Sequence, residues 1–158
     1  MAYKGGADYE RTFQVLYGIA AVAFVVGVLL LAKPTQPDPP NSKAFGCYTS
    51  AQAAPILLNQ QGMAILQPDE IKIRYHLERH KTGIALTADA PIAAERAGNR
   101  YVFSIKPPGV GWYLDFFNVI NGETYGVFDE NALQQFTMLA RDGNYLPYRK
   151  ASERECQV

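Results

Sequence analysis

The chain has few of the residue types and motifs on which specialised chemistry depends. Its 158 residues include only two cysteines and two histidines, too few thiolates for a zinc site built from cysteine alone. Neither sign of charge is in excess, because 15 basic residues balance 15 acidic ones, and this excludes electrostatic capture of nucleic acid by the chain as a whole. There is no Gly-x-Ser-x-Gly motif, and Gly109-Val110-Gly111 lacks the lysine of a phosphate-binding loop. We therefore predict no catalytic residue, no cofactor and no metal ion.

The two histidines have the spacing of ligands in helical zinc sites but lack the rest of that motif. His76 and His80 are four residues apart, and the metalloprotease pattern requires a glutamate directly after the first histidine. That position is Leu77, and the nearest glutamate is Glu78. The alternation of residues 71–77 predicts the end of a strand, where we expect the two rings not to share a face. We interpret the histidines as part of an exposed hairpin tip.

One long stretch without charge dominates the first third of the chain. Residues 13–32, FQVLYGIAAVAFVVGVLLLA, carry no acidic or basic side chain. A helix of about 20 residues spans roughly 30 Å, which is the thickness of the hydrocarbon core of a bilayer. The main alternative is a cleaved signal peptide, but its apolar stretch is usually about 7–15 residues long, and Lys33 and Pro34 follow here. The sequence predicts a retained transmembrane helix.

The orientation of this helix depends on weaker signals. Lys4 and Arg11 precede it, and Lys33 and Lys43 follow it, so the positive-inside rule gives a tie. Because residues 1–12 are too short for a domain, we expect them to form a cytoplasmic tail. The protein would then be a single-pass protein of the cell membrane with its main body in the periplasm.

A proline-rich spacer separates the predicted helix from the rest of the chain. Residues 33–43 contain four prolines, which exclude a helix and favour extended polyproline II. At about 3.1 Å per residue this spacer would form a stalk of roughly 30 Å. The predicted organisation is a tail (1–12), a transmembrane helix (13–32), a stalk (33–43), a globular domain (44–150) and a C-terminal tail (151–158).

The globular domain is rich in strand patterns. Residues 71–77 alternate apolar and polar side chains, and residues 100–106 and 112–120 are rich in aromatic and β-branched types. Asn121-Gly122 is the strongest hairpin signal, because both positions of a type I′ turn require positive φ. Two further turns are expected at Gly98-Asn99 and Gln60-Gln61-Gly62. These signals predict a mainly-β (α+β) domain folded as an antiparallel meander, small barrel or roll.

One helix is expected near the C-terminal end of this domain. Asp129 is placed to cap it, and Phe128 and Leu133 are placed to form a hydrophobic staple. Apolar residues recur between positions 132 and 140 at helical spacing, and Gly143 is placed to end the helix. The residues that follow are expected to form a tail.

The two cysteines lie near opposite ends of the predicted domain. A bond between Cys47 and Cys156 would tie the tail to the first strand. By closing a loop of order 100 residues it would restrict the unfolded chain by about 4–5 kcal/mol. The alternative is two free thiols, one buried and one in a mobile tail. An oxidising compartment favours the bond, and the sequence leaves both alternatives open.

Two places in the chain are candidates for contact with another molecule. Trp112 and Tyr113 follow a loop rich in proline and glycine, where aromatic side chains can anchor a partner protein, stack on a sugar or rest on lipid headgroups. The alternative is that they begin a core strand. Within the predicted membrane helix, Ala23 and Gly27 form a small-xxx-small pair, which can bring two membrane helices into close contact.

The predicted anchor, stalk and domain together favour a non-enzymatic function. We expect an accessory or scaffold subunit of a larger membrane-associated complex, in contact with the lipid bilayer and with other membrane proteins. One alternative is a tethered domain that binds a lipid, glycan or peptide, which a deep apolar cavity near Trp112 would favour. A second is a component of a secretion or envelope machine. An enzyme is not expected, although a histidine beside a carboxylate in a cleft would count in its favour.

Overall fold

The chain divides into two units that are described separately. A computed structural model describes residues 17, 22, 24, 36–105 and 113–156. Internal contacts separate residues 1–36 from residues 37–158. The second unit is the β-rich domain, which holds nearly all the described residues.

The predicted transmembrane helix falls in the first unit. The residues of this stretch that the structure describes are helical, and they are Tyr17, Val22 and Phe24. No helix formed by described residues has the length and apolar character needed to cross a membrane. The rest of 13–32, including Ala23 and Gly27, lies outside the described residues, so the anchor stays a prediction.

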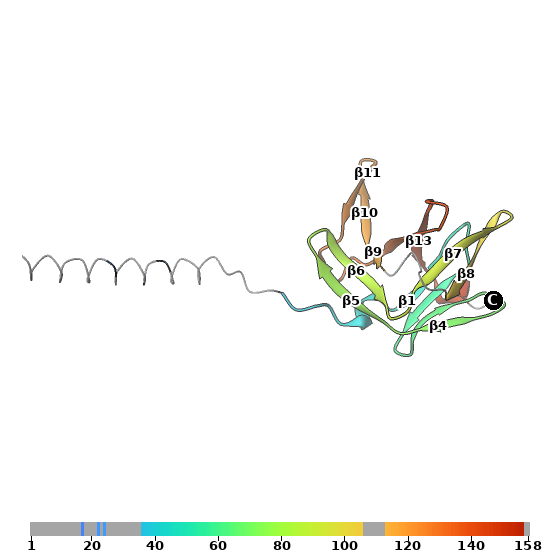
Figure 1. Ribbon diagram of the computed structural model, residues 1–158, viewed down its shortest axis with the longest axis horizontal. Helices are drawn as coiled ribbons and strands as arrows, with labels where there is room; N and C mark the ends of the chain where they lie inside the picture. Colours follow the sequence, from blue (N-terminus) through green and yellow to red (C-terminus); the bar gives the residue numbers. More distant parts are fainter. Residues whose placement is uncertain (1–16, 18–21, 23, 25–35, 106–112, 157–158) are drawn as a thin grey trace, which may run out of the picture. The chain divides into compact units, whose positions relative to one another are not determined.

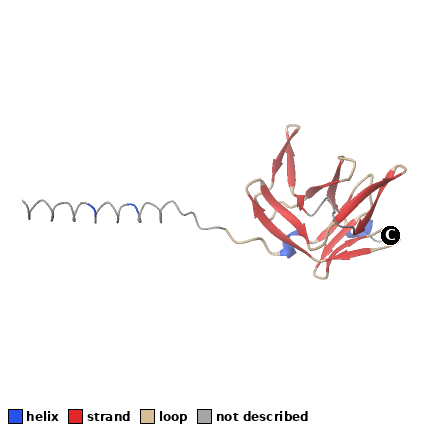
Figure 2. Cartoon of the chain, in the orientation of Figure 1, coloured by secondary structure: helices blue, strands red, loops and turns tan. Residues whose placement is uncertain are grey.

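The second unit is a mainly-β domain of antiparallel sheets (Figures 1 and 2). Its first strands are β1 (Gly46–Thr49), β2 (Ile56–Asn59), β3 (Gly62–Ile65), β4 (Ile71–Ile73), β5 (Tyr75–His80), β6 (Gly83–Ala88) and β7 (Ile92–Ala97). The later strands are β8 (Arg100–Ile105), β9 (Tyr113–Asp115), β10 (Phe117–Ile120), β11 (Glu123–Gly126), β12 (Gln135–Leu139) and β13 (Tyr145–Ala151). Two short 3-10 helices, Asn41–Ala44 and Glu153–Cys156, flank them. The predicted mainly-β antiparallel class is confirmed.

Two sheets curl around one core as a half-barrel. The larger sheet has six strands in the order β12–β13–β1–β2–β3–β4, and the smaller has the order β5–β6–β9. Only Arg74 separates β4 from β5, and an isolated bridge between Phe116 and Phe136 links the smaller sheet to β12. The hairpins β7–β8 and β10–β11 are separate two-stranded sheets. The first and last of the described strands are therefore neighbours, since β1 pairs with β13.

Four aromatic residues form the centre of this core. The rings of Phe136 and Tyr148 stack 5.2 Å apart, and Phe116 meets Phe136 edge-on at 5.6 Å. The ring of Tyr48 packs on that of Phe136, with 5.0 Å between the ring centroids. The Tyr148 hydroxyl donates to the Ala54 carbonyl oxygen (2.9 Å), so the buried phenol is hydrogen-bonded. Burial raises the pKa of Tyr48 and of Tyr148 well above the ordinary value for tyrosine.

All three predicted turns join neighbouring strands. Asn121 and Gly122 have φ of 53° and 84° and connect β10 to β11. Gly98, with φ of 65°, lies in the turn between β7 and β8, and Gln60-Gln61 connects β2 to β3. These turns could be predicted from the sequence because the positive φ that they require depends on the turn residues themselves.

The helix predicted after Asp129 is wrong. That side chain accepts a hydrogen bond within a turn, and Gln135–Leu139 forms β12, which pairs along its whole length with β13. Phe136 and Met138 are fully buried, whereas their neighbours in the strand are half-buried. The segment thus has a period of two as well as an apparent helical period, and pairing with β13 decides between them. Phe128 is 61% exposed, so it forms no staple.

The predicted C-terminal tail belongs to the domain. β13 lies between β12 and β1, and Gly143, with φ of 84°, sits in the turn before it. Pro147 made a strand here hard to recognise, because proline cannot donate a hydrogen bond to a neighbouring strand. It faces Thr137 of β12 at a point that β1 does not reach, since β1 pairs only with residues 149–151. The missing N–H of Pro147 therefore costs no hydrogen bond between β13 and β1.

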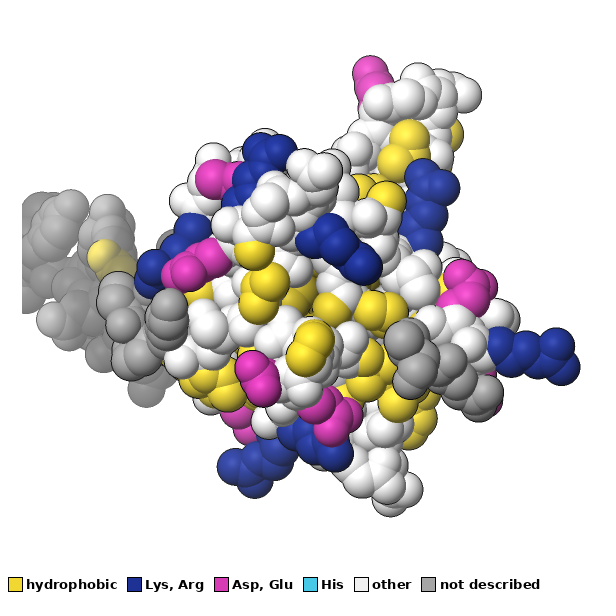
Figure 3. All heavy atoms as spheres, turned by 90° about the vertical axis from the view of Figure 1, so that its right-hand side faces the viewer, with side chains coloured by type: hydrophobic (Ala, Val, Ile, Leu, Met, Phe, Trp, Pro, Cys, Tyr) yellow, Lys and Arg dark blue, Asp and Glu magenta, His cyan; other side chains and the backbone are white. Residues whose placement is uncertain are grey.

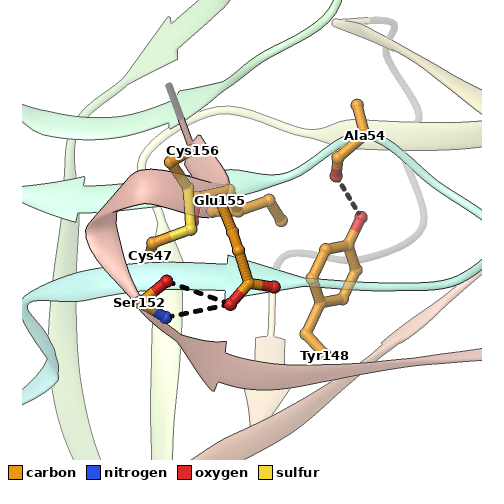
Figure 4. Close-up of a disulfide and its surroundings, with 7 residues drawn as sticks. Cys47, Ala54, Tyr148, Ser152, Glu155 and Cys156 are labelled. Atoms are coloured by element: carbon orange, nitrogen blue, oxygen red, sulfur yellow. Dashed lines mark hydrogen bonds between the residues drawn. A yellow bond between two sulfur atoms is a disulfide. The ribbon is translucent and has the colours of Figure 1, made fainter. Parts of the chain in front are cut away.

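A disulfide closes the C-terminal end of the domain onto β1 (Figure 4). It joins Cys47 to Cys156, which are 109 residues apart in the sequence. Ser152 donates to the Glu155 carboxylate through its backbone N–H (3.3 Å) and its hydroxyl (3.1 Å), which stabilises the turn that leads to the bond. Of the two alternatives for the cysteines, the structure contains the bonded pair.

The domain begins inside the predicted stalk. Pro39 is buried, and the Asn41 amide donates to the Tyr75 carbonyl oxygen (2.9 Å) and accepts a hydrogen bond from the same strand. Residues 37–43 therefore pack on β5, and the proposed stalk of 33–43 loses its C-terminal half to the domain.

Arg79 fastens this first segment of the domain. Its guanidinium donates to the carbonyl oxygens of Pro37 (2.9 Å) and Phe128 (3.1 Å) and forms an ion pair with Glu130 (3.3 Å). Only 17% of the Arg79 side chain is exposed. We expect Arg79→Ala to lower the free energy of unfolding by about 1–2 kcal/mol and to speed amide hydrogen exchange at its contacts.

The matched control for this variant is Arg74→Ala. The Arg74 side chain is 87% exposed and pairs with Asp89 alone among the described residues, so its loss is expected to change stability by at most about 0.5 kcal/mol. Urea unfolding of the two variants compares them directly. An equal loss in both would show that the Arg79 contacts do not hold the segment.

Candidate functional site

Three titratable side chains form a row on the outer face of β5. His76, Glu78 and His80 alternate with buried or half-buried residues of this strand. His76 Nε2 lies 2.6 Å from Glu78 Oε1, and His80 Nε2 lies 3.2 Å from Glu78 Oε2. The expectation that the two rings do not share a face is wrong, because every second residue of a strand points to the same side. One carboxylate therefore joins two imidazole rings.

The other nitrogen of His76 meets a second carboxylate. His76 Nδ1 lies 3.4 Å from Asp89, which also pairs with the Arg74 guanidinium at 3.4 Å. The hydrogen bond to Glu78 raises the pKa of His76 above its usual value of 6.5; burial opposes this rise, and Asp89 adds a smaller contribution to it. The resulting stabilisation is complete below pH 6.5 and is lost as the pH rises through the raised pKa.

Removing the charge of Glu78 tests this cluster. Glu78→Gln keeps the size of the side chain but removes the charge that favours imidazolium, so we expect the pKa of His76 to fall towards its ordinary value. The ring protons of His76, followed by NMR against pH, give this pKa. Glu70→Gln is the control, because Glu70 pairs with Lys72 rather than with a histidine. The same pKa in all three proteins would contradict the role of Glu78.

His76 and Asp89 also line a polar hollow of about 390 Å³. A histidine beside a carboxylate at a hollow is the arrangement that would favour an enzyme. The described lining residues, however, include no serine, threonine, cysteine or lysine that His76 could activate. The amide of Asn41, which lines the same hollow, is already bonded to β5. Among the described residues, no group of three or more His, Cys, Asp or Glu side chains could hold a metal ion.

A second hollow lies where β5 turns into β6. It has a volume of about 550 Å³ and is lined by His80, Lys81, Thr82, Tyr113 and Asp115. The rings of His80 and Tyr113 meet edge-on at 5.5 Å. Within the described part of the chain, no hydrogen bond or ion pair engages the Asp115 carboxylate. The hollow therefore combines an exposed aromatic ring with a carboxylate that pairs with no described residue and with the basic side chain of Lys81.

The outer face of the β5–β6–β9 sheet holds another polar group without a partner. The strand register places Thr87 between His76 and Tyr113, and Ala85 between Glu78 and Asp115. Thr87 is only 8% exposed, and its hydroxyl has no hydrogen-bond partner among the described residues. Buried polar groups are normally satisfied, so this face is polar and incompletely bonded.

The hairpin β10–β11, called the ribbon below (117–126), projects from the rest of the domain (Figure 1). All side chains of β11 are exposed. Of the eight large hydrophobic side chains that are exposed among the described residues of the domain, five lie between positions 113 and 128. They are Tyr113, Val119, Ile120, Tyr125 and Phe128, each 48–61% exposed. An isolated two-stranded hairpin is marginally stable in water, so the attachment of the ribbon matters.

The base of the ribbon is fixed to the turn that lines the hollow. Ile84 N–H donates to the Val127 carbonyl oxygen (2.7 Å), and Val127 N–H donates to that of Phe116 (3.2 Å). A Cβ atom at Gly126 would lie 1.6 Å from the Thr82 carbonyl oxygen, so only glycine permits this close approach. The ribbon and the hollow are therefore neighbours on one surface.

The structure places the predicted contact residues as follows. Tyr113 begins β9 and is 54% exposed, so it is a surface residue at the rim of the second hollow and not a core residue. Trp112, Ala23 and Gly27 lie outside the described residues. The sequence reasoning predicted the turn of the ribbon but missed its exposed hydrophobic side chains, and it missed the row on β5. One available signal was charge, because residues 107–140 contain four acidic residues and no lysine or arginine.

Comparisons with protein-family models, with curated proteins and with solved structures gave no match to this chain.

Proposed function

We propose that this protein is a single-pass membrane-anchored accessory or scaffold subunit that presents its β-domain outside the cytoplasm to a larger membrane-associated complex. The observation that carries this proposal is the gathering of exposed hydrophobic side chains on and beside the ribbon. Exposed hydrophobic side chains that gather in one region of a domain are typical of a contact site for a protein. Figure 3 shows hydrophobic and charged side chains side by side on one face of the domain.

Two further observations support the location. The uncharged stretch 13–32 has the length of a membrane span. The Cys47–Cys156 disulfide is of the kind that persists in oxidising compartments and is rare in the cytosol. The Arg79 contacts hold the first residues of the domain in place within it.

A second candidate function is a membrane-tethered domain that binds a peptide. The hollow at Tyr113 favours it, because an aromatic ring beside a free carboxylate suits a peptide side chain. The same hollow is less suited to a lipid, since His80, Lys81 and Asp115 line it. The first candidate remains the stronger because the ribbon extends the apolar surface beyond a single small hollow. A component of a secretion or envelope machine is a variant of the first candidate function.

Copurification from native membranes tests the first candidate. In mild detergent the full-length chain should retain one or more partners in fixed stoichiometry. The variant Val119→Ser with Ile120→Ser removes two exposed apolar side chains of the ribbon, and we expect at least about tenfold less bound partner. The matched control is Val102→Ser with Ile105→Ser, which changes the same residue types at exposed positions of β8. A chain that is solitary in every preparation would refute the proposal.

A further inference from the structure

A third hollow lies where three segments that are distant in the sequence come together. It has a volume of about 300 Å³. Its walls come from the segment between β1 and β2, from the hairpin β7–β8, and from the turn before β13 together with the first residue of that strand. The lining residues are Gln52, Arg96, Asn99, Tyr101, Asn144 and Tyr145. Loops on a rigid scaffold are the usual place for a binding site.

Hydrogen bonds through Tyr101 hold these segments together. Tyr101 is 6% exposed, and its backbone N–H donates to the Gln52 carbonyl oxygen (2.8 Å). Its hydroxyl donates to the Asp142 carboxylate (2.8 Å) and accepts a hydrogen bond from the Asn144 side-chain amide (3.0 Å). One buried tyrosine therefore links all three walls, and the shape of the hollow is set before any ligand enters it. A preformed site loses less conformational freedom on binding.

The hollow also offers unused hydrogen-bonding groups. The side-chain amides of Gln52 and Asn99 form no hydrogen bond within the described part of the chain. The Asn144 amide nitrogen donates to both Tyr101 (3.0 Å) and Asp142 (2.9 Å), which leaves the carbonyl oxygen of that side chain without a partner among the described residues. Each amide provides both donors and an acceptor, so the lining suits a ligand with several neighbouring polar groups.

An exposed aromatic ring lies beside these amides. Tyr145 is 68% exposed, which is the largest exposed fraction among the large hydrophobic side chains described in the domain. Arg96 is the single charged residue of the described lining, and its Nε donates to the Gly98 carbonyl oxygen (3.2 Å). A lining with one guanidinium and no carboxylate disfavours a cation. An apolar ligand is disfavoured too, because it would remove the amides from water without bonding them.

We propose that this hollow binds a sugar ring of a glycan. A pyranose has a face of C–H groups, which can stack on the Tyr145 ring, and a rim of hydroxyl groups, which can donate to and accept from the side-chain amides of Gln52 and Asn99. The volume is at the lower end of the range for ligand pockets, about 300–1,000 Å³, and fits a single ring. The inference goes beyond the proposed function and does not depend on it, because the hollow shares no residue with the ribbon.

Titration of the full-length chain with three small saccharides tests the inference. The probes are cellotriose, chitotriose and trigalacturonate, and the detergent must carry no sugar headgroup. We expect at least one of them to shift the NMR signals of the Tyr145 ring and the Gln52 side-chain amide, with a dissociation constant of about 1 mM. A preference for trigalacturonate that Arg96→Gln removes would show that the site takes an acidic sugar. No preference for trigalacturonate would show that it takes a neutral one.

Two pairs of variants assign the binding to the hollow. Tyr145→Ser removes the stacking surface and should weaken binding about tenfold, whereas Tyr125→Ser makes the same change on the ribbon and should not. Gln52→Ala should weaken binding about threefold. Its control is Gln61→Ala, at an exposed position of the turn between β2 and β3. Both Gln52 and Tyr145 are exposed, so these variants should keep the fold.

The outcomes that would overturn the inference are distinct. One is the failure of all three saccharides to shift the two signals at about 50 mM. Another is saccharide binding that neither Tyr145→Ser nor Gln52→Ala weakens, which would place the sugar elsewhere. Equal shifts from the capped tripeptide Gly-Asn-Gly would overturn it in favour of a peptide site. Each of these results leaves the copurification test of the ribbon unaffected, so the two proposals fail separately.

Discussion

Reduction of the Cys47–Cys156 disulfide is expected to lower the free energy of unfolding of the domain by about 4–5 kcal/mol. The bond closes a loop of 109 residues, so breaking it restores a large amount of conformational freedom to the unfolded chain. It also releases β13 and the final 3-10 helix from the covalent tie to β1. Few single changes in this chain remove as much stability.

Urea unfolding with and without reductant, followed by circular dichroism of the full-length chain in detergent, measures this effect. The control is a Cys47→Ala, Cys156→Ala double variant, which should unfold at low urea under both conditions and be insensitive to reductant. If the wild-type midpoint does not move on reduction, the bond contributes nothing to the stability of the domain.

Phe136→Ala is expected to cost about 3–5 kcal/mol of unfolding free energy. The Phe136 ring is fully buried between Tyr148 and Phe116, and its backbone forms the isolated bridge that links β12 to Phe116. Alanine would leave a cavity where the half-barrel closes, and the surrounding aromatic rings can collapse only partly into it. The loss should therefore exceed the transfer energy of the ring alone.

Thr137→Ala provides the matched control for this prediction. Thr137 is the next residue of β12 and its side chain points to the other face of the strand, where it is half-buried. We expect a change of at most about 1 kcal/mol. Thermal or urea unfolding of both variants gives the comparison, and a cost below about 1 kcal/mol for Phe136→Ala would place the centre of the core elsewhere.

The strands and turns with purely local signals could be predicted from the sequence. Asn121-Gly122 and Gly98-Asn99 define hairpins because the backbone conformation they require depends on those residues alone. β12 could not be predicted in the same way, since its apolar residues also match a helical period. Its partner β13 was hidden by Pro147, and β13 pairs in addition with β1, about 100 residues away. Long-range pairing of this kind leaves no local trace.

The candidate site was predictable only in part. Tyr113 was identified from its place after a loop, and the structure puts it on the surface. Asp115 lies between two apolar residues in the sequence and is exposed in β9. Its lack of a partner and its closeness to His80 and the ribbon depend on how β6 and β9 pair. The shared face of His76 and His80 could have been recognised, because a spacing of four places residues on one side of a strand as well as of a helix.

The most direct test of the proposed function is the accessibility of a C-terminal epitope tag on the full-length chain in right-side-out membrane vesicles. Because residues 13–32 should anchor the chain and the domain should lie outside the cytoplasm, the tag is expected to stay in the membrane pellet after an alkaline wash. It should also bind antibody before the vesicles are opened. Release of the chain by the wash, or antibody binding only after lysis, would contradict an outward-facing anchored domain.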